Sequence, residues 1–180
     1  PHHLFMNEKD IQTLGAFAEM KPGLKTEQDQ KALWNGIKNG IVDVIASDHA
    51  PHLKEEKELA NYPFGVPGVE TMLPLLLDAF NKNKMSLPTI IKLCCENPAR
   101  IFRIRNKGLL KVGYDADLVI VDLDKKQVVR NDDLLTKCKW SPFEGKILKG
   151  WPVTTIVNGN MVYDNGEIFK IKAKEVQYGR

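Results

Sequence analysis

The chain has 180 residues, of which 43% are hydrophobic and 27% are charged, and its formal net charge is +3. These values are typical of one globular domain and do not favour a disordered chain. The small net charge does not support a nucleic-acid-binding surface, and no apolar run approaches the roughly 20 residues that a membrane span needs. The first residue is Pro1 rather than Met, so we expect the sequence to begin inside a longer one.

The first third of the chain predicts the alternation of strands and helices that is typical of α/β proteins. We expect a strand at the start of the chain and a helix over residues 26–39. Thr26 can cap this helix, Asp29 lies at its third position, and Gly40 follows as a stop. The β-branched run 41–46 predicts a short buried strand, which suggests a parallel sheet.

The middle of the chain predicts a loop followed by helices. Residues 53–67 are first charged and then rich in Gly and Pro, which favours a loop. Apolar residues at helical spacing predict a helix over 69–83. Two further helices are predicted over 87–95, with Ser86 as its cap, and over 98–103.

The last part of the chain predicts short strands instead of helices. We expect strands at 117–122, 127–130, 153–157 and 160–163. Asn158-Gly159 joins the last two and is a strong signal for a tight hairpin. The chain therefore divides into an α/β part, residues 1–105, and a mostly β part, residues 106–180. Each part has too few strands to cover its own sheet, so both are expected to be pieces of larger layers.

The segment whose side chains are best suited to catalysis or metal binding runs from Ala46 to His52 and directly follows the predicted strand. Ligands of parallel α/β folds bind beyond the carboxyl ends of the strands. Asp48 at this position could bind a divalent metal and accept a proton, and His52 could face an anionic substrate. In the structural alternative, Asp48 caps a turn and the histidines are polar loop residues.

Three other polar segments have a structural interpretation as their default. His2 and His3 are adjacent, so on a strand at most one of them faces a given site. Lys21 lies in a turn, residues 20–25, that is expected to be solvated. The charged run 54–58 is expected to be a solvated loop.

The Gly/Pro-rich segment 64–68 lies just before a predicted helix, where Phe64 and Gly65 could lie close to a ligand. The Walker phosphate-loop pattern is absent from the sequence. The residues of the aromatic turn 140–145 indicate no chemical role. The three cysteines, Cys94, Cys95 and Cys138, are expected to be buried or partly buried thiols in a reducing compartment, and a catalytic cysteine is the alternative.

Taken together, these segments resemble the dihydroorotases, zinc enzymes of the amidohydrolase superfamily. The strongest similarity is ASDHAPH, with Glu56-Lys57 and then FGVPGVET, which resembles the second signature of that family. Weaker landmarks are PHHLF, MKPGLKTEQDQKAL, ENPARIF, GYDADLVIVD, WSPFEGKILKG and TIVNGNMVY. Hydantoinases and allantoinases share the GxDADLVIxD and NGxxVY patterns but usually lack the histidine at the position of His52.

The resemblance implies an α/β fold: part of a (β/α)8 TIM-type barrel, namely its last strands and helices in residues 1–105, followed by part of a small β-sandwich in residues 106–180. It also implies Zn²⁺, mononuclear or dinuclear, in the full-length enzyme. The family's other metal ligands are expected before Pro1. A zinc site needs about three protein ligands, so we expect this chain alone to be inactive.

The resemblance also implies roles for individual residues. Asp48 matches the aspartate that binds zinc and moves a proton from the attacking hydroxide to the leaving ring nitrogen. His52 matches the histidine that contacts the substrate carboxylate, and Phe64 and Gly65 fall in the loop that contacts the pyrimidine ring. Lys21 stands where many members have Asn or Arg, and we assign it to substrate binding as a cation.

The reaction implied is the reversible conversion of L-dihydroorotate to N-carbamoyl-L-aspartate in pyrimidine biosynthesis. The implied partners are a small-molecule substrate, a second copy in a homodimer and aspartate transcarbamoylase, with no nucleic acid or membrane, in the cytoplasm. Two alternatives stay open. One is an allantoinase or hydantoinase, against which His52 argues, and the other is a non-catalytic dihydroorotase-like scaffold subunit.

Overall fold

The structure of the protein is a computed structural model that describes residues 1–179. Its longest helix has 12 residues, and no helix among residues 1–179 is long and apolar enough to cross a membrane. The elements, in chain order, are α1 (His2–Phe5), α2 (Glu8–Leu14), η1 (Gly15–Ala18), α3 (Glu27–Lys38), α4 (Lys54–Lys57), α5 (Met72–Asn81), α6 (Leu87–Ile91), η2 (Lys92–Glu96), α7 (Asn97–Ile101), β1 (Leu118–Val128), η3 (Asn131–Asp133), β2 (Ile147–Val157), β3 (Asn160–Asp164) and β4 (Glu167–Ile168).

The predicted capping of α3 is confirmed. The Thr26 hydroxyl accepts a hydrogen bond from the Asp29 amide at 3.2 Å, and the Asp29 carboxylate accepts one in return from the Thr26 amide at 3.1 Å. This reciprocal arrangement pairs two amides that a helix start leaves free. Gly40 follows the helix with a φ of 71°, a conformation that glycine adopts without strain.

The two predicted helices after Ser86 are one continuous helical stretch. The Ser86 hydroxyl caps its start by accepting from the Thr89 amide at 3.2 Å. In the middle, η2 is a π-helical turn that leads directly into α7. Pro98, which has no N–H to donate, lies immediately after this turn.

The β part forms one antiparallel sheet with the strand order β1-β2-β3-β4. The predicted hairpin at Asn158-Gly159 is confirmed, with φ values of 50° and 77° that suit a tight turn. The predicted strands 117–122 and 127–130 are joined in one long strand, β1, whose pairing with β2 has two irregularities. The short strand β4 was not predicted.

The two strands expected in the α/β part are not strands in this structure. Residues 2–5 close a helical turn, α1, because the Pro1 carbonyl accepts hydrogen bonds from the amides of Leu4 and Phe5. Residues 41–46 have no strand partner among residues 1–179, and the Ile45 amide instead donates to the Leu93 carbonyl of η2 at 3.1 Å. A β-branched run becomes a strand only where a neighbouring strand completes its ladder.

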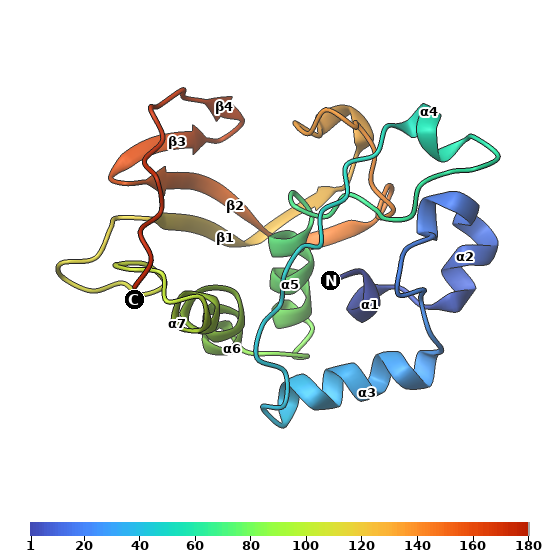
Figure 1. Ribbon diagram of the computed structural model, residues 1–180, viewed down its shortest axis with the longest axis horizontal. Coiled ribbons are helices and arrows are strands. Elements are labelled where there is room, and N and C mark those ends of the chain that lie inside the picture. Colours follow the sequence, from blue (N-terminus) through green and yellow to red (C-terminus); the bar gives the residue numbers. More distant parts are fainter. Residues whose placement is uncertain (180) are drawn as a thin grey trace.

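Helix α5 lies at the centre of the molecule and supports the sheet (Figure 1). The Asn81 side-chain amide donates to the carbonyls of Leu123 in β1 and Lys149 in β2, both at 3.0 Å. One apolar cluster joins α5 to the first 24 residues and to residues 129–148; its buried members are Met6, Ala18, Met20, Leu24, Val66, Leu75, Val129, Cys138, Trp140, Phe143 and Leu148. The α/β part and the β part therefore share a core.

Candidate functional site

The segment that carries Asp48 runs from the end of α3 past α5 to α4 (Figure 1). Ile45 anchors it in the core against the apolar residues of α5. Asp48 then has a φ of 45°, in the left-handed region, and its side chain is 72% exposed. Asp is one of the few residues that adopt this conformation readily. The backbone thus presents the Asp48 carboxylate to solvent at the edge of the core.

The nearest acid–base partner of Asp48 is His2. Its Nε2 lies 3.6 Å from the Asp48 carboxylate, and the His3 ring lies edge-on to the His2 ring at 4.5 Å. Burial lowers the pKa of His2 to about 4, so its imidazole is neutral at pH 7. The contact is therefore one between a carboxylate and a neutral imidazole, which is a possible metal ligand.

These residues do not form a complete zinc site by themselves. A catalytic zinc ion needs about three protein ligands. Within residues 1–179, no group of three or more His, Cys, Asp or Glu side chains is placed to hold a metal ion. Asp48 and His2 supply only a pair of possible ligands.

The structure brings the predicted substrate-binding residues together beside this segment. The Lys21 ammonium lies 4.2 Å from the centroid of the Phe64 ring, a cation–π contact. The Gly65 amide donates to the Glu19 carbonyl at 2.9 Å, which joins the turn of Lys21 to the loop of Phe64. One face of the site is therefore built from both segments.

Gly65 also fits closely against the segment of His52. Its φ is 121°, and a Cβ at this position would lie 2.5 Å from the Ala50 Cβ and 3.8 Å from the His52 ring. Only glycine allows the loop this backbone conformation and this close approach. The His52 side chain is 35% exposed, and its Nδ1 lies 3.9 Å from the Glu56 carboxylate.

The charged run 54–58 is solvated as predicted except at Lys57, but most of it is a short helix and not a loop. Residues 54–57 form the short helix α4, whose last residue, Lys57, is only 1% exposed. Burial lowers the pKa of Lys57. Its ammonium donates to three backbone carbonyls, those of Glu19, Pro63 and Gly65. No local sequence pattern predicts this burial, because the acceptors lie in segments outside the run.

Two other residues hold the loop that follows Asp48. The His49 Nδ1 accepts a hydrogen bond from the Gly68 amide at 3.1 Å, so the structural interpretation of this histidine holds. The Trp140 indole N–H donates to the His52 carbonyl at 2.7 Å. Trp140 is 2% exposed. The sequence predicted no role for its aromatic turn, but in the structure this turn holds the His52 segment through that hydrogen bond.

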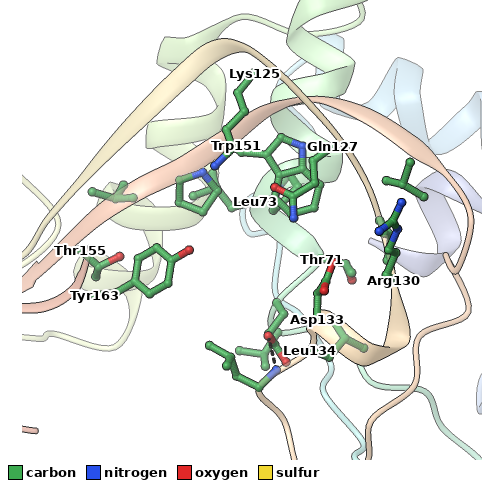
Figure 2. A pocket seen from close by; sticks show the side chains of 18 residues that line it. Thr71, Leu73, Lys125, Gln127, Arg130, Asp133, Leu134, Trp151, Thr155 and Tyr163 are labelled. Atoms are coloured by element: carbon green, nitrogen blue, oxygen red, sulfur yellow. Dashed lines mark hydrogen bonds between the residues drawn. The ribbon is translucent and has the colours of Figure 1, made fainter. Parts of the chain in front are cut away.

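A separate cavity of about 440 Å³ lies between α5 and the sheet (Figure 2). Its lining is largely apolar and includes Leu73, Trp151 and Tyr163. None of the predicted site residues lines it in the described part of the chain. We therefore place the candidate site at the Asp48–His52 segment.

The cysteines do not contribute a nucleophile to this site. Burial raises the pKa of Cys94 to about 12, so its thiol is protonated at neutral pH. Cys138 is buried in the core, but Cys95 is exposed, which corrects the expectation that all three thiols are at least partly buried. Cys95 lies in the η2 turn, in which Leu93 is the buried residue.

Comparisons with known proteins identify the relatives of this chain. The model of the amidohydrolase family matches residues 4–162. The dihydroorotase of Halobacterium salinarum is 40% identical over 179 residues, which are 98% of this chain and 42% of that protein. The dihydroorotase of Methanosarcina mazei is 47% identical over 167 residues, which are 91% of this chain and 36% of that protein.

Solved structures give a consistent result. The L-hydantoinase (dihydropyrimidinase) from Arthrobacter aurescens superimposes with a TM-score of 0.90 at 34% identity, and the match covers 94% of this chain and 39% of that one. A D-hydantoinase superimposes with a TM-score of 0.86 at 29% identity. The chain spans about two fifths of the length of these relatives. The matches confirm the resemblance to dihydroorotases that the sequence motifs predicted.

Proposed function

The chain belongs to the amidohydrolase family, and from this premise we propose that it is part of a dihydroorotase, an enzyme that interconverts L-dihydroorotate and N-carbamoyl-L-aspartate. The observation that carries the proposal is the 40–47% identity to dihydroorotases across almost the whole chain. The two solved hydantoinases are less similar in sequence, at 34% and 29% identity. The hydantoinase alternative is therefore less supported.

Because the chain spans only 36–42% of these dihydroorotases, we propose that catalysis needs the rest of their length as well. The complete protein is then residues 1–180 together with segments that correspond to the rest of the dihydroorotase length. In it, residues 1–105 form the last strands and helices of a (β/α)8 barrel, and residues 106–180 form strands of a flanking β-sandwich. Such a barrel typically needs about 250 residues, more than this chain contains.

The complete protein is proposed to bind zinc, with one or two ions, through Asp48 and ligands outside this chain. Zinc would polarise the substrate carbonyl and increase the acidity of a water molecule. The exposure of Asp48 and its position four residues before His52 support its place at the metal. Asp48 and His2 are two possible ligands, and the others that zinc needs would come from outside this chain.

In the hydrolytic direction, a hydroxide attacks the ring amide carbonyl carbon, and the bond from this carbon to the ring nitrogen breaks. Asp48 takes the proton of the attacking hydroxide and passes it to the leaving nitrogen. His52 binds the substrate carboxylate, and the backbone around Phe64 and Gly65 contacts the ring. Lys21 adds a positive charge beside an anionic substrate, which its position over the Phe64 ring supports.

The remaining expectations extend this proposal. A homodimer, an association with aspartate transcarbamoylase and a cytoplasmic location are proposed from the resemblance. The three free thiols support a reducing compartment.

The test is hydrolysis of L-dihydroorotate by the zinc-loaded complete protein, with isolated residues 1–180 as the matched control. We expect turnover by the complete protein and none by the isolated chain. A complete protein that folds and binds zinc but does not turn over dihydroorotate would favour the scaffold alternative. Turnover by residues 1–180 alone would refute the assignment of the missing ligands to other segments.

A further inference from the structure

Lys57 is a buried cation in a segment that is otherwise solvated. Its Nζ donates to the carbonyls of Pro63 at 2.8 Å, Gly65 at 3.0 Å and Glu19 at 3.3 Å. An ammonium has three N–H donors, so these acceptors use all of them. A buried charge is tolerated only when it is paired or fully hydrogen-bonded, and the three carbonyls meet this requirement.

The carbonyls belong to the two segments that carry the proposed substrate contacts. Pro63 and Gly65 flank Phe64 on both sides, and Glu19 lies two residues before Lys21. The Glu19 carbonyl also accepts the Gly65 amide at 2.9 Å. Lys57 is thus the common partner of the turn that carries Lys21 and the loop that carries Phe64.

Besides Lys57, the contacts of the loop around Phe64 include the edge-on Tyr62 and Phe64 rings, the Lys21 ammonium over the Phe64 ring and the Gly65 amide on the Glu19 carbonyl. Over the range 1–179, no backbone amide of residues 60–64 donates a hydrogen bond to another backbone group. Residues 58–61 and Phe64 are exposed and Tyr62 and Pro63 are half-buried, so no residue of the stretch 58–64 is fully buried. The hydrogen bonds from Lys57 to Pro63 and Gly65 supply order that the loop's own backbone does not.

We propose that Lys57 is a positioning residue for substrate binding: it does not touch the substrate, but it holds the Phe64–Gly65 loop and the Lys21 turn in the conformation that binds it. This inference rests on the proposed function of that loop. Without Lys57, the loop samples other conformations, and the apparent affinity for substrate falls in proportion to the fraction of molecules in the competent one. The chemical step at Asp48 is then affected less than binding.

The matched variants are Lys57→Met and Lys54→Met in the complete protein. Met keeps most of the length of Lys and removes the donors, and Lys54 lies exposed on the same short helix. For Lys57→Met we expect the KM for L-dihydroorotate to rise about tenfold while kcat changes less than about threefold. Lys54→Met should leave both constants unchanged.

Hydrogen exchange of the peptide spanning residues 58–66 gives a second readout that needs no turnover. We expect the Gly65 amide to exchange about tenfold faster in Lys57→Met than in the parent, and at the parental rate in Lys54→Met. If Lys57→Met does not fold, Lys57→Gln keeps a shorter side chain with two donors and should give intermediate values of KM and exchange.

The outcomes separate the two proposals. An inactive parent protein refutes the proposed function, whereas the exchange experiment still tests whether Lys57 orders the loop. An active parent with an unchanged KM in Lys57→Met refutes the positioning role, whatever the exchange rate. A fall in kcat and melting temperature with an unchanged KM assigns Lys57 to folding alone and also overturns the proposal.

Discussion

Replacement of Asp48 by Asn separates chemistry from folding in the proposed site. Asn has nearly the same shape and also tolerates a positive φ, here 45°, so the variant does not strain the backbone. The Asp48 side chain is 72% exposed, and its nearest acid–base partner, His2, is 3.6 Å away. We therefore expect the free energy of unfolding to change by less than about 0.5 kcal/mol, as for other surface substitutions.

The effect on catalysis should be far larger. An amide can neither accept the proton of the attacking hydroxide nor bind zinc as a carboxylate does. Loss of a general base costs roughly 10²–10⁴-fold, and loss of a metal ligand adds to this. We expect kcat of the complete protein to fall about a thousandfold or more, equivalent to about 4 kcal/mol in the activation free energy.

The assay is steady-state hydrolysis of L-dihydroorotate, together with thermal unfolding of the same preparations. Asp43→Asn is the matched control, because Asp43 is exposed on the same segment and lies before the proposed site. It should keep the parental kcat. A kcat for Asp48→Asn within about threefold of the parent, which is little more than 0.6 kcal/mol, would remove Asp48 from its proposed role.

Three further substitutions test the surroundings of Asp48. His52→Ala should raise the KM roughly ten- to a hundredfold, since a hydrogen bond to a charged group is worth about 1.5–3 kcal/mol; an unchanged KM would exclude the carboxylate contact. Trp140→Phe removes the donor to the His52 carbonyl and should lower the free energy of unfolding by about 1 kcal/mol in denaturant titrations; full stability would show that this bond contributes nothing. Gly65→Ala places a Cβ 2.5 Å from the Ala50 Cβ at a φ of 121° and should cost more than about 1 kcal/mol of stability and raise the KM; a variant as stable as the parent would contradict the close packing described here.

Local signals in the sequence correctly predicted the cap of α3 and the hairpin turn between β2 and β3. Thr26 and Asp29 lie three residues apart and cap α3 as predicted. The Asn158-Gly159 turn closes the predicted hairpin between β2 and β3. Both features depend on a few consecutive residues and on backbone conformations that those residue types favour.

Prediction failed where the outcome depends on distant partners. The run 41–46 has the composition of a buried strand, but no strand pairs with it among residues 1–179, so it stays extended and unpaired. The start of the chain was also predicted as a strand and forms α1 instead. The helix α2 is a different case, because it was missed although the capping box of Asn7 and Asp10 at its start is a local signal.

The candidate site shows the same division. The motif around Asp48 and His52 was visible in the sequence, and the structure places Lys21, Phe64 and Gly65 beside it. Lys57 was missed because a lysine in a charged run has no local signal for burial. Its three acceptors come from residues 19, 63 and 65, and only the folded chain brings them to one point.

This chain is proposed to contribute to a site that is specific for dihydroorotate. The most direct test is the ratio of kcat/KM of the zinc-loaded complete protein for L-dihydroorotate to its kcat/KM for hydantoin and for allantoin. A site that binds the substrate carboxylate through His52 rejects analogues without that carboxylate, so we expect a preference of at least about a hundredfold for dihydroorotate. A protein that hydrolyses hydantoin or allantoin as well as, or better than, dihydroorotate would contradict the account.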